Sequence, residues 1–184
     1  MNQNNIVIDE SSIVDHTMIA PLGKLSVGKE CVINGELVAT SGNITIGNYV
    51  VINQGTRIFS ADKIIIEDNV MISWNCNIVD SNMHSLHSAD RLKDTQTARE
   101  AIRTNTIGQN VDSTNIVSKP VTIKEGAWIG FNAIIMKGVT IGKGALDSMA
   151  AKLPYAKMLT SVPLAIVVCG DTTLSSYWYL DCSA

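Results

Sequence analysis

Residues 121–146 read VTIKEGAWIGFNAIIMKGVTIGKGAL, and in this stretch an aliphatic residue returns at every sixth position. A small residue lies four positions after each of them. A period of six fits neither the 3.6-residue repeat of an α-helix nor the two-residue alternation of a half-buried strand. It is typical of a parallel β-helix, in which each hexad supplies one short strand and one corner. The aliphatic positions are Ile123, Ile129, Ile135 and Ile141, and the small positions are Ala127, Ala133, Val139 and Ala145.

The pattern recurs upstream, as it must, because one coil cannot bury its apolar side alone. It begins at Val27 and continues, with short insertions, to Ile78. We therefore predict an all-β solenoid with a parallel β-helix over 27–146, preceded by an irregular segment over 1–26. Residues 147–184 are predicted to form a divergent C-terminal segment, because Asp147 stands where an aliphatic residue is expected. The aliphatic column is Val27, Ile33, Ile46, Ile52, Ile58, Ile66, Ile72 and Ile78, and the small column is Cys31, Leu37, Val50, Thr56, Val70 and Cys76.

Composition excludes several classes of protein. The chain has 184 residues, 46% hydrophobic and 17% charged, as expected for one globular domain. A net charge of -3 gives no basic surface for nucleic acid. The longest apolar run, 162–169, is too short to span a membrane, and the first residues do not form a signal peptide. The four cysteines lack zinc-site spacing, so we expect no metal, buried free thiols at Cys31 and Cys76, and a cytoplasmic location.

Residues 80–119 interrupt the hexads with a long polar excursion, DSNMHSLHSADRLKDTQTAREAIRTN followed by a return to the repeat. A loop of this length in a compact repeat array is usually either functional or disordered. Within it, the stretch from Asp90 to Ile102 is compatible with a short helix, although its apolar stripe is thin.

The stretch SKPVTIKEGAWIGFNAIIMKGVTIGKGA at 118–145, together with NVMISWNCNIVDSNMHSL at 69–86, resembles the hexapeptide-repeat O-acetyltransferases that modify sugars. The similarity covers roughly residues 25–146. It implies a left-handed β-helix, acetyl-CoA as co-substrate and direct transfer of the acetyl group to a hydroxyl of a sugar or polysaccharide precursor. It also implies a homotrimer with the active site between subunits.

The catalytic histidine of that family stands on the loop that leaves the coil, and His84 occupies the matching place. A neutral imidazole is well suited to take the proton of an attacking hydroxyl near pH 7. His87 is the rival for this role, and a solvated loop residue is the alternative for either. His16 lies outside the repeats and is expected on the surface.

Two polar residues near these coils are candidates for binding the acceptor. Asn53 matches a position where galactoside-type members place an asparagine on the acceptor, although a turn asparagine is the alternative. Asp80 is a candidate for orienting the imidazole, as in other pairs of a base and its orienting carboxylate. A solvated loop carboxylate is the other interpretation of Asp80.

In the family the coenzyme lies along the coils, and the resemblance assigns it a set of residues near the AWIG motif. Small corner residues also have a packing explanation that needs no ligand. The C-terminus departs from the family, with Ser161 in place of a lysine and Asp171-Thr172 in place of the Asn-Pro of the closing turn. A non-catalytic scaffold, an acyltransferase with a non-sugar acceptor and a zinc-dependent carbonic anhydrase of the same architecture are the alternatives. The last needs three histidines that converge across an interface, whereas this chain has three in total and no partner for His84 and His87 a coil or two upstream. The coenzyme candidates are Trp128, Gly130, Asn132, Ala133, Lys137 and Gly138.

Overall fold

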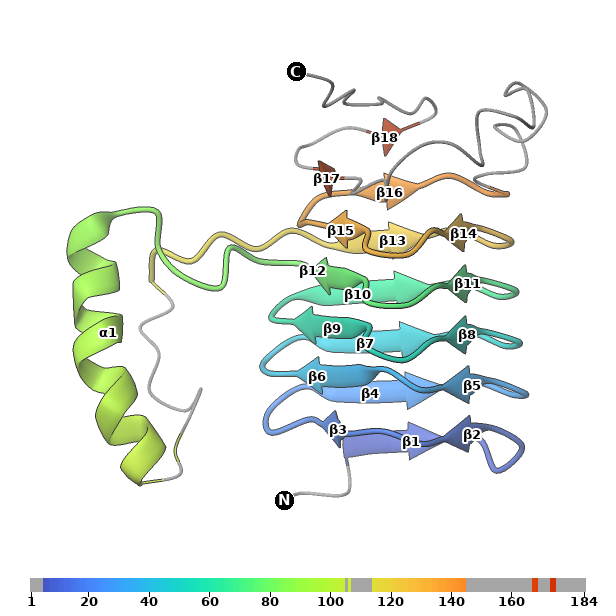
Figure 1. Cartoon of the computed structure of the whole chain (residues 1–184), viewed down its shortest axis with the longest axis horizontal. Coiled ribbons are helices and arrows are strands. Elements are labelled where there is room, and N and C mark those ends of the chain that lie inside the picture. The colour runs from blue at the N-terminus through green and yellow to red at the C-terminus, as the bar shows by residue number, and fades with distance from the viewer. Residues whose placement is uncertain (1–4, 105, 107–113, 145–166, 169–172, 175–184) are drawn as a thin grey trace.

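The computed structural model describes residues 5–104, 106, 114–144, 167–168 and 173–174, and these residues form three parallel β-sheets (Figure 1). The first sheet has the order β1 (Ile6–Ile8), β4 (Lys24–Val27), β7 (Asn43–Ile46), β10 (Lys63–Ile66), β13 (Val121–Ile123), β16 (Thr140–Ile141) and β18 (Thr173–Leu174). The second has the order β14 (Trp128–Ile129), β11 (Met71–Ile72), β8 (Val51–Ile52), β5 (Val32–Ile33) and β2 (Ile13–Val14). The third has the order β17 (Val167–Val168), β15 (Ile134–Ile135), β12 (Asn77–Val79), β9 (Arg57–Ser60), β6 (Glu36–Ala39) and β3 (Met18–Ile19).

The chain visits the three sheets in rotation, so that each set of three strands lies on the preceding set (Figure 1). All pairings between these strands are parallel, and each pairs with its counterpart one coil away. This arrangement is consistent with the parallel β-helix that the hexads predict.

The isoleucines of the hexads form continuous buried columns. In the second sheet Ile52 lies in register with Ile72 and Ile72 with Ile129, and in the first sheet Ile66 lies in register with Ile123. These side chains belong to one apolar core between the sheets, where packing between adjacent coils is the main source of stability. The predicted free thiols Cys31 and Cys76 are both buried, which confirms the inward small column at these positions.

The N-terminal residues differ from the prediction, because from Ile6 onward they form β1, β2 and β3 and complete a further coil. Met18 follows Val14 by only four positions, as Leu37 follows Ile33 one coil later. The stretch from the second to the third strand of these two coils is therefore shorter than a hexad, so a search for a period of six does not find the third strand. Leu37, assigned to the small column, instead lies in register with Ile58.

The excursion leaves the coils after β12 and returns at β13 without disturbing the stack, since β10 and β13 pair directly. It contains α1 (Ser88–Arg103), which confirms the helix expected over Asp90–Ile102. No residue of α1 is buried, and the helix lies to one side of the sheets (Figure 1). None of the helices in the described part of the chain is long and apolar enough to cross a membrane.

Most of the segment expected to diverge, 147–184, lies outside the described residues, including Asp147, Ser161 and Asp171-Thr172. Within it, β17 pairs in parallel with β15, and β18 pairs with β16.

Candidate active site

The two ends of the excursion are joined where it leaves the coils. Ser81 and Ser118 form an antiparallel bridge, the amide of Asn82 donates to the carbonyl of Val117 at 3.0 Å, and the amide of Lys119 donates to the carbonyl of Asp80 at 2.9 Å. Backbone hydrogen bonds of this kind fix the outgoing and returning chains relative to each other. The residues that follow Asn82 therefore start from a defined position beside the third sheet.

A tight turn at Met83 sets the direction of His84. The amide of His84 donates to the carbonyl of Asn82 at 2.7 Å, which closes a three-residue turn around Met83. Met83 has φ of 63°, in the left-handed region that non-glycine residues with long side chains rarely adopt. Unfavourable backbone conformations of this kind concentrate at functional sites, so the turn marks the segment for a functional hypothesis.

The imidazole of His84 contacts a carboxylate from α1. Its Nδ1 lies 2.8 Å from Oδ2 of Asp94, and the side chains are 57% and 16% exposed, respectively. A carboxylate at Nδ1 favours the tautomer that carries its proton there, which leaves the lone pair on Nε2. Nε2 has no hydrogen-bond partner among the described residues. The site therefore presents a potential proton acceptor to an incoming ligand.

Hydrogen bonds around Ser85 attach the N-terminus of α1 to both arms of the excursion. The buried Ser85 hydroxyl donates to Oδ2 of Asp90 at 2.8 Å, and Asn115 Nδ2 on the returning arm donates to the same oxygen at 2.8 Å. These two hydrogen bonds lower the pKa of Asp90, and the one from Ser85 has the larger effect. Arg91 donates to the carbonyl of Ser85 at 2.9 Å. Polar contacts, rather than apolar burial, hold the helix in place.

His87 stands at a different place from His84. It is the N-cap residue of α1, and its amide donates to the Ser85 hydroxyl at 3.0 Å. Its exposed ring forms no hydrogen bond with another described residue, and the side chain does not cap the helix. Of the two rival histidines, His84 is the one with an oriented ring.

Asp80 is a buried structural residue, and this corrects its interpretation both as a solvated carboxylate and as the partner of His84. Its side chain is 0% exposed. Its carboxylate accepts hydrogen bonds from the Ser60 hydroxyl at 2.7 Å, the Ala61 amide at 2.8 Å and the Asp62 amide at 3.0 Å. Asp80 therefore fastens the corner of the preceding coil, and Asp94 takes the place beside the histidine.

Asn53 lies between two coils. Its side-chain Nδ2 and its backbone amide each donate to the carbonyl of Ile72 at 3.0 Å. Asn53 follows β8, at the corner before the third sheet, whereas His84 lies beyond the corner after that sheet. No hydrogen bond joins Asn53 to His84 among the described residues, and a role of Asn53 at the acceptor stays a prediction.

Trp128 is an exposed coenzyme candidate. It lies on the outer face of β14 beside Met71 of β11, and its side chain is 47% exposed. Its indole N–H donates to the Ser73 hydroxyl at 3.1 Å, which fixes the ring against the sheet. Gly130 follows at the corner, where an added Cβ would meet no atom within 4 Å, so packing within the chain does not require glycine there.

The remaining coenzyme candidates lie along the next corners of the same coils. Asn132 and Gly138 have positive φ values of 60° and 79°, so both serve the turns as expected for residues at coil corners. The Ala133 side chain is buried in the core and is not accessible to a ligand, which corrects its assignment as lining. Lys137 is half-buried. Gly138 lies at the base of the excursion, where its amide donates to the carbonyl of Lys119 at 3.2 Å, and all of these candidates belong to the coil that follows the excursion.

Two features of the site had no signal in the sequence. Asp94 follows His84 by ten residues on a helix that buries no residue, and no motif connects the two. The residue with left-handed backbone dihedrals is Met83, and methionine is not a residue type that predicts such a turn. The positive-φ positions at Asn69 and Asn75, by contrast, are at residues that favour them.

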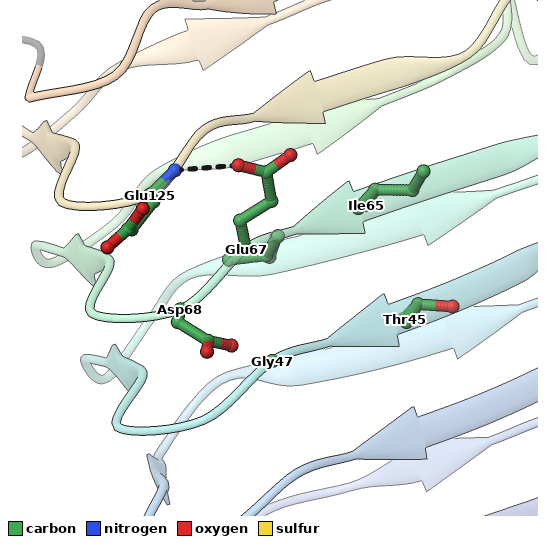
Figure 2. Close-up of a pocket in the computed structure, with 7 residues that line it drawn as sticks. Thr45, Gly47, Ile65, Glu67, Asp68 and Glu125 are labelled. Atoms are coloured by element: carbon green, nitrogen blue, oxygen red, sulfur yellow. Dashed lines mark hydrogen bonds between the residues drawn. The ribbon is translucent and has the colours of Figure 1, made fainter.

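An acidic groove lies over the first sheet, and its lining residues are Thr45, Gly47, Ile65, Ile66, Glu67, Asp68 and Glu125 (Figure 2). Glu67 accepts hydrogen bonds from Lys124 Nζ at 2.7 Å and from the Glu125 amide at 3.0 Å, and Lys124 chiefly lowers the pKa of Glu67. Asp68 accepts from the Asn48 amide at 2.8 Å. These carboxylates connect successive coils. Within the described residues, no three His, Cys, Asp or Glu side chains gather as a metal site.

Comparisons with known proteins give no further assignment. No family model matches the chain, and a search of curated proteins finds no match.

Proposed function

We propose that the protein is an acetyl-CoA-dependent O-acetyltransferase that acts on a hydroxyl of a sugar or polysaccharide precursor, with His84 as general base. The observation that carries the proposal is the state of the His84 ring. It is more than half exposed, one nitrogen is held by a carboxylate at 2.8 Å, and the other is open to a ligand. A side chain placed in this way suits proton abstraction from a hydroxyl near neutral pH.

The reaction follows from this placement. Nε2 of His84 accepts the proton of the acceptor hydroxyl while the hydroxyl oxygen attacks the thioester carbonyl of acetyl-CoA. The tetrahedral intermediate then collapses, the C–S bond breaks, and the imidazolium returns its proton to the leaving thiolate. The products are the acetyl ester and free CoA. A hydrogen-bond donor would stabilise the oxyanion of the intermediate.

Direct transfer without an acyl-enzyme agrees with the state of the described cysteines. Cys31 and Cys76 are both fully buried in the core. Burial is the main cause that raises the pKa of the Cys76 thiol, which disfavours the nucleophilic thiolate. Neither thiol is therefore suited to carry the acetyl group.

A left-handed coil and a homotrimer with the site between subunits are parts of the same proposal, as is a cytoplasmic location. One feature that supports an assembly is the outer face of the second sheet, where every outward position is apolar. Exposed apolar ladders of this length are unusual on a monomer and are typical of interaction surfaces. The ladder consists of Ile13, Val32, Val51, Met71 and Trp128.

The test is acceptor-dependent release of CoA. The protein is incubated with acetyl-CoA, a thiol-reactive chromophore and a panel of sugars, and products are examined by mass spectrometry for one added acetyl group. We expect release with at least one sugar and loss of that release in His84→Ala. A folded wild-type protein that releases CoA with none of the hydroxyl acceptors would contradict the proposal and favour the scaffold alternative.

A further inference from the structure

We infer that Asp94 of α1 is the positioning residue of the site: it fixes the ring of His84 with the proton on Nδ1, so that Nε2 is the atom that accepts a proton from the acceptor. The catalytic consequence rests on the proposed function, whereas the tautomer itself does not. Asp94 reaches the histidine from a separate element, since His84 lies on the outgoing arm and Asp94 lies in the second turn of α1.

The pattern of exposure along α1 identifies the face that meets the excursion. Asp90, Asp94 and Ala101 are half-buried, and the other residues of α1 are exposed. These three positions lie on one face of a helix, and its two carboxylates make the contacts. Asp90 binds the Ser85 hydroxyl and Asn115, and Asp94 binds the imidazole of His84. The inner face of α1 is therefore built around carboxylates rather than around apolar packing.

The His84–Asp94 contact contributes little as a stabilising ion pair. Ion pairs with one largely exposed partner have small effects on stability, because water screens the charges. The contact instead determines the orientation of the His84 ring and which of its two nitrogens carries the proton. A carboxylate accepts hydrogen bonds and donates none when ionised, so the neutral imidazole must place its N–H toward Asp94. The strained turn at Met83 and the carboxylate thus fix the same ring from two sides.

Replacing Asp94 by asparagine removes this specification. An amide presents either an oxygen or an NH₂ group to Nδ1, so both tautomers of His84 become compatible with the contact. The form with its proton on Nε2 cannot act as the base, which is the reason that an Asp→Asn change beside a catalytic histidine lowers turnover without destroying the site. We expect Asp94→Asn to lower kcat at least roughly tenfold, and by no more than removal of the base itself. KM for acetyl-CoA should stay within about twofold, because the contact of Asp94 is with the histidine ring.

The experiment is a long-range proton–nitrogen NMR correlation of the histidine rings in the full ¹⁵N-labelled chain, above the pH at which the rings are protonated. With only three histidines in the chain, the His84 ring is assigned by the signal that disappears in His84→Ala. Wild type should show a protonated Nδ1 and a bare Nε2 at His84. Asp94→Asn should shift His84 toward the opposite tautomer. Glu100→Gln is the matched control, because Glu100 lies on the same helix and faces Arg103 at 3.9 Å.

The outcomes separate this inference from the proposed function. A wild-type His84 with its proton on Nε2 overturns the inference whether or not Asp94→Asn folds, and so does an Asp94→Asn protein with an unchanged tautomer. The predicted tautomers together with a selective fall in kcat support it, and Glu100→Gln should match wild type in both. If wild-type protein transfers acetyl to no acceptor, the proposed function fails while the NMR result still decides the role of Asp94.

Discussion

Replacing Asp80 by alanine should destabilise the protein without changing the chemistry of its site. The carboxylate is fully buried and accepts three hydrogen bonds, from the Ser60 hydroxyl and from the amides of Ala61 and Asp62. The hydroxyl has a second acceptor in the Asn43 carbonyl at 3.2 Å, so its loss is largely compensated. The two amides lose their acceptor in a partly buried corner, at about 1–3 kcal/mol each. The expected loss of unfolding free energy is therefore about 2–6 kcal/mol.

The assay is urea unfolding followed by far-UV circular dichroism. Asp62→Ala is the matched control, because its side chain accepts no hydrogen bond among the described residues and lies in the same corner. The control should stay within about 0.5 kcal/mol of wild type, as is usual for substitutions away from buried contacts. At a temperature where both are folded, Asp80→Ala should retain kcat within a few-fold. If Asp80→Ala were as stable as Asp62→Ala, or if it stayed folded but lost turnover like His84→Ala, the structural role assigned to Asp80 would be refuted.

Three further predictions concern the core, the excursion and the thiols. Ile72→Ala should lower the unfolding free energy by about 2–5 kcal/mol, whereas Lys63→Ala, at an exposed position of β10, should cost less than about 1 kcal/mol; parallel urea titrations compare the two variants. Hydrogen bonding lowers the pKa of Asp90 in the folded chain, so the contribution of its carboxylate to holding α1 is complete above the ordinary pKa of 3.8. That contribution is lost as the pH falls through the lower folded pKa. Amide NMR signals of α1 that are as well dispersed at pH 2 as at pH 6 would contradict this prediction. Burial raises the pKa of the Cys76 thiol, so Cys76 should resist iodoacetamide in the folded protein and react with it in urea; peptide mass spectrometry measures the modification.

The hexads predicted the sheets because a repeated inward contact leaves a repeated residue type. Ile52, Ile72 and Ile129 are aliphatic for the same reason, namely that each packs on its counterpart in the next coil. The first coil was not predicted because the stretch between Val14 and Met18 is shorter than a hexad. The six-residue period breaks there, although the parallel strand pairing continues. Strand pairing depends on the backbone, and only the side-chain pattern is visible in a sequence.

The site was predictable only in part, because loop geometry has no period. His84 was predicted as the base from the resemblance to the O-acetyltransferases, and the structure shows its ring oriented by a carboxylate. The sequence offered Asp80 as a candidate for that carboxylate, with a solvated loop residue as the alternative, but Asp80 is buried under the preceding corner. The carboxylate that makes the contact, Asp94, depends on how α1 folds back toward the outgoing arm. A polar helix with a thin apolar stripe gives no indication of which face turns inward.

The most direct test of the account is a comparison of kcat for His84→Ala and His87→Ala with acetyl-CoA and one working sugar acceptor. A positioned base contributes typically 10²–10⁴-fold, so His84→Ala should lose at least about a hundredfold, or roughly 3 kcal/mol of transition-state stabilisation. The kcat of His87→Ala should stay within a few-fold of wild type. His87 is the N-cap residue of α1 through its backbone, and its ring forms no hydrogen bond with another described residue. Acetyl-CoA affinity should be nearly unchanged in both variants. An inactive His87→Ala protein beside an active His84→Ala protein would contradict the assignment of the general base.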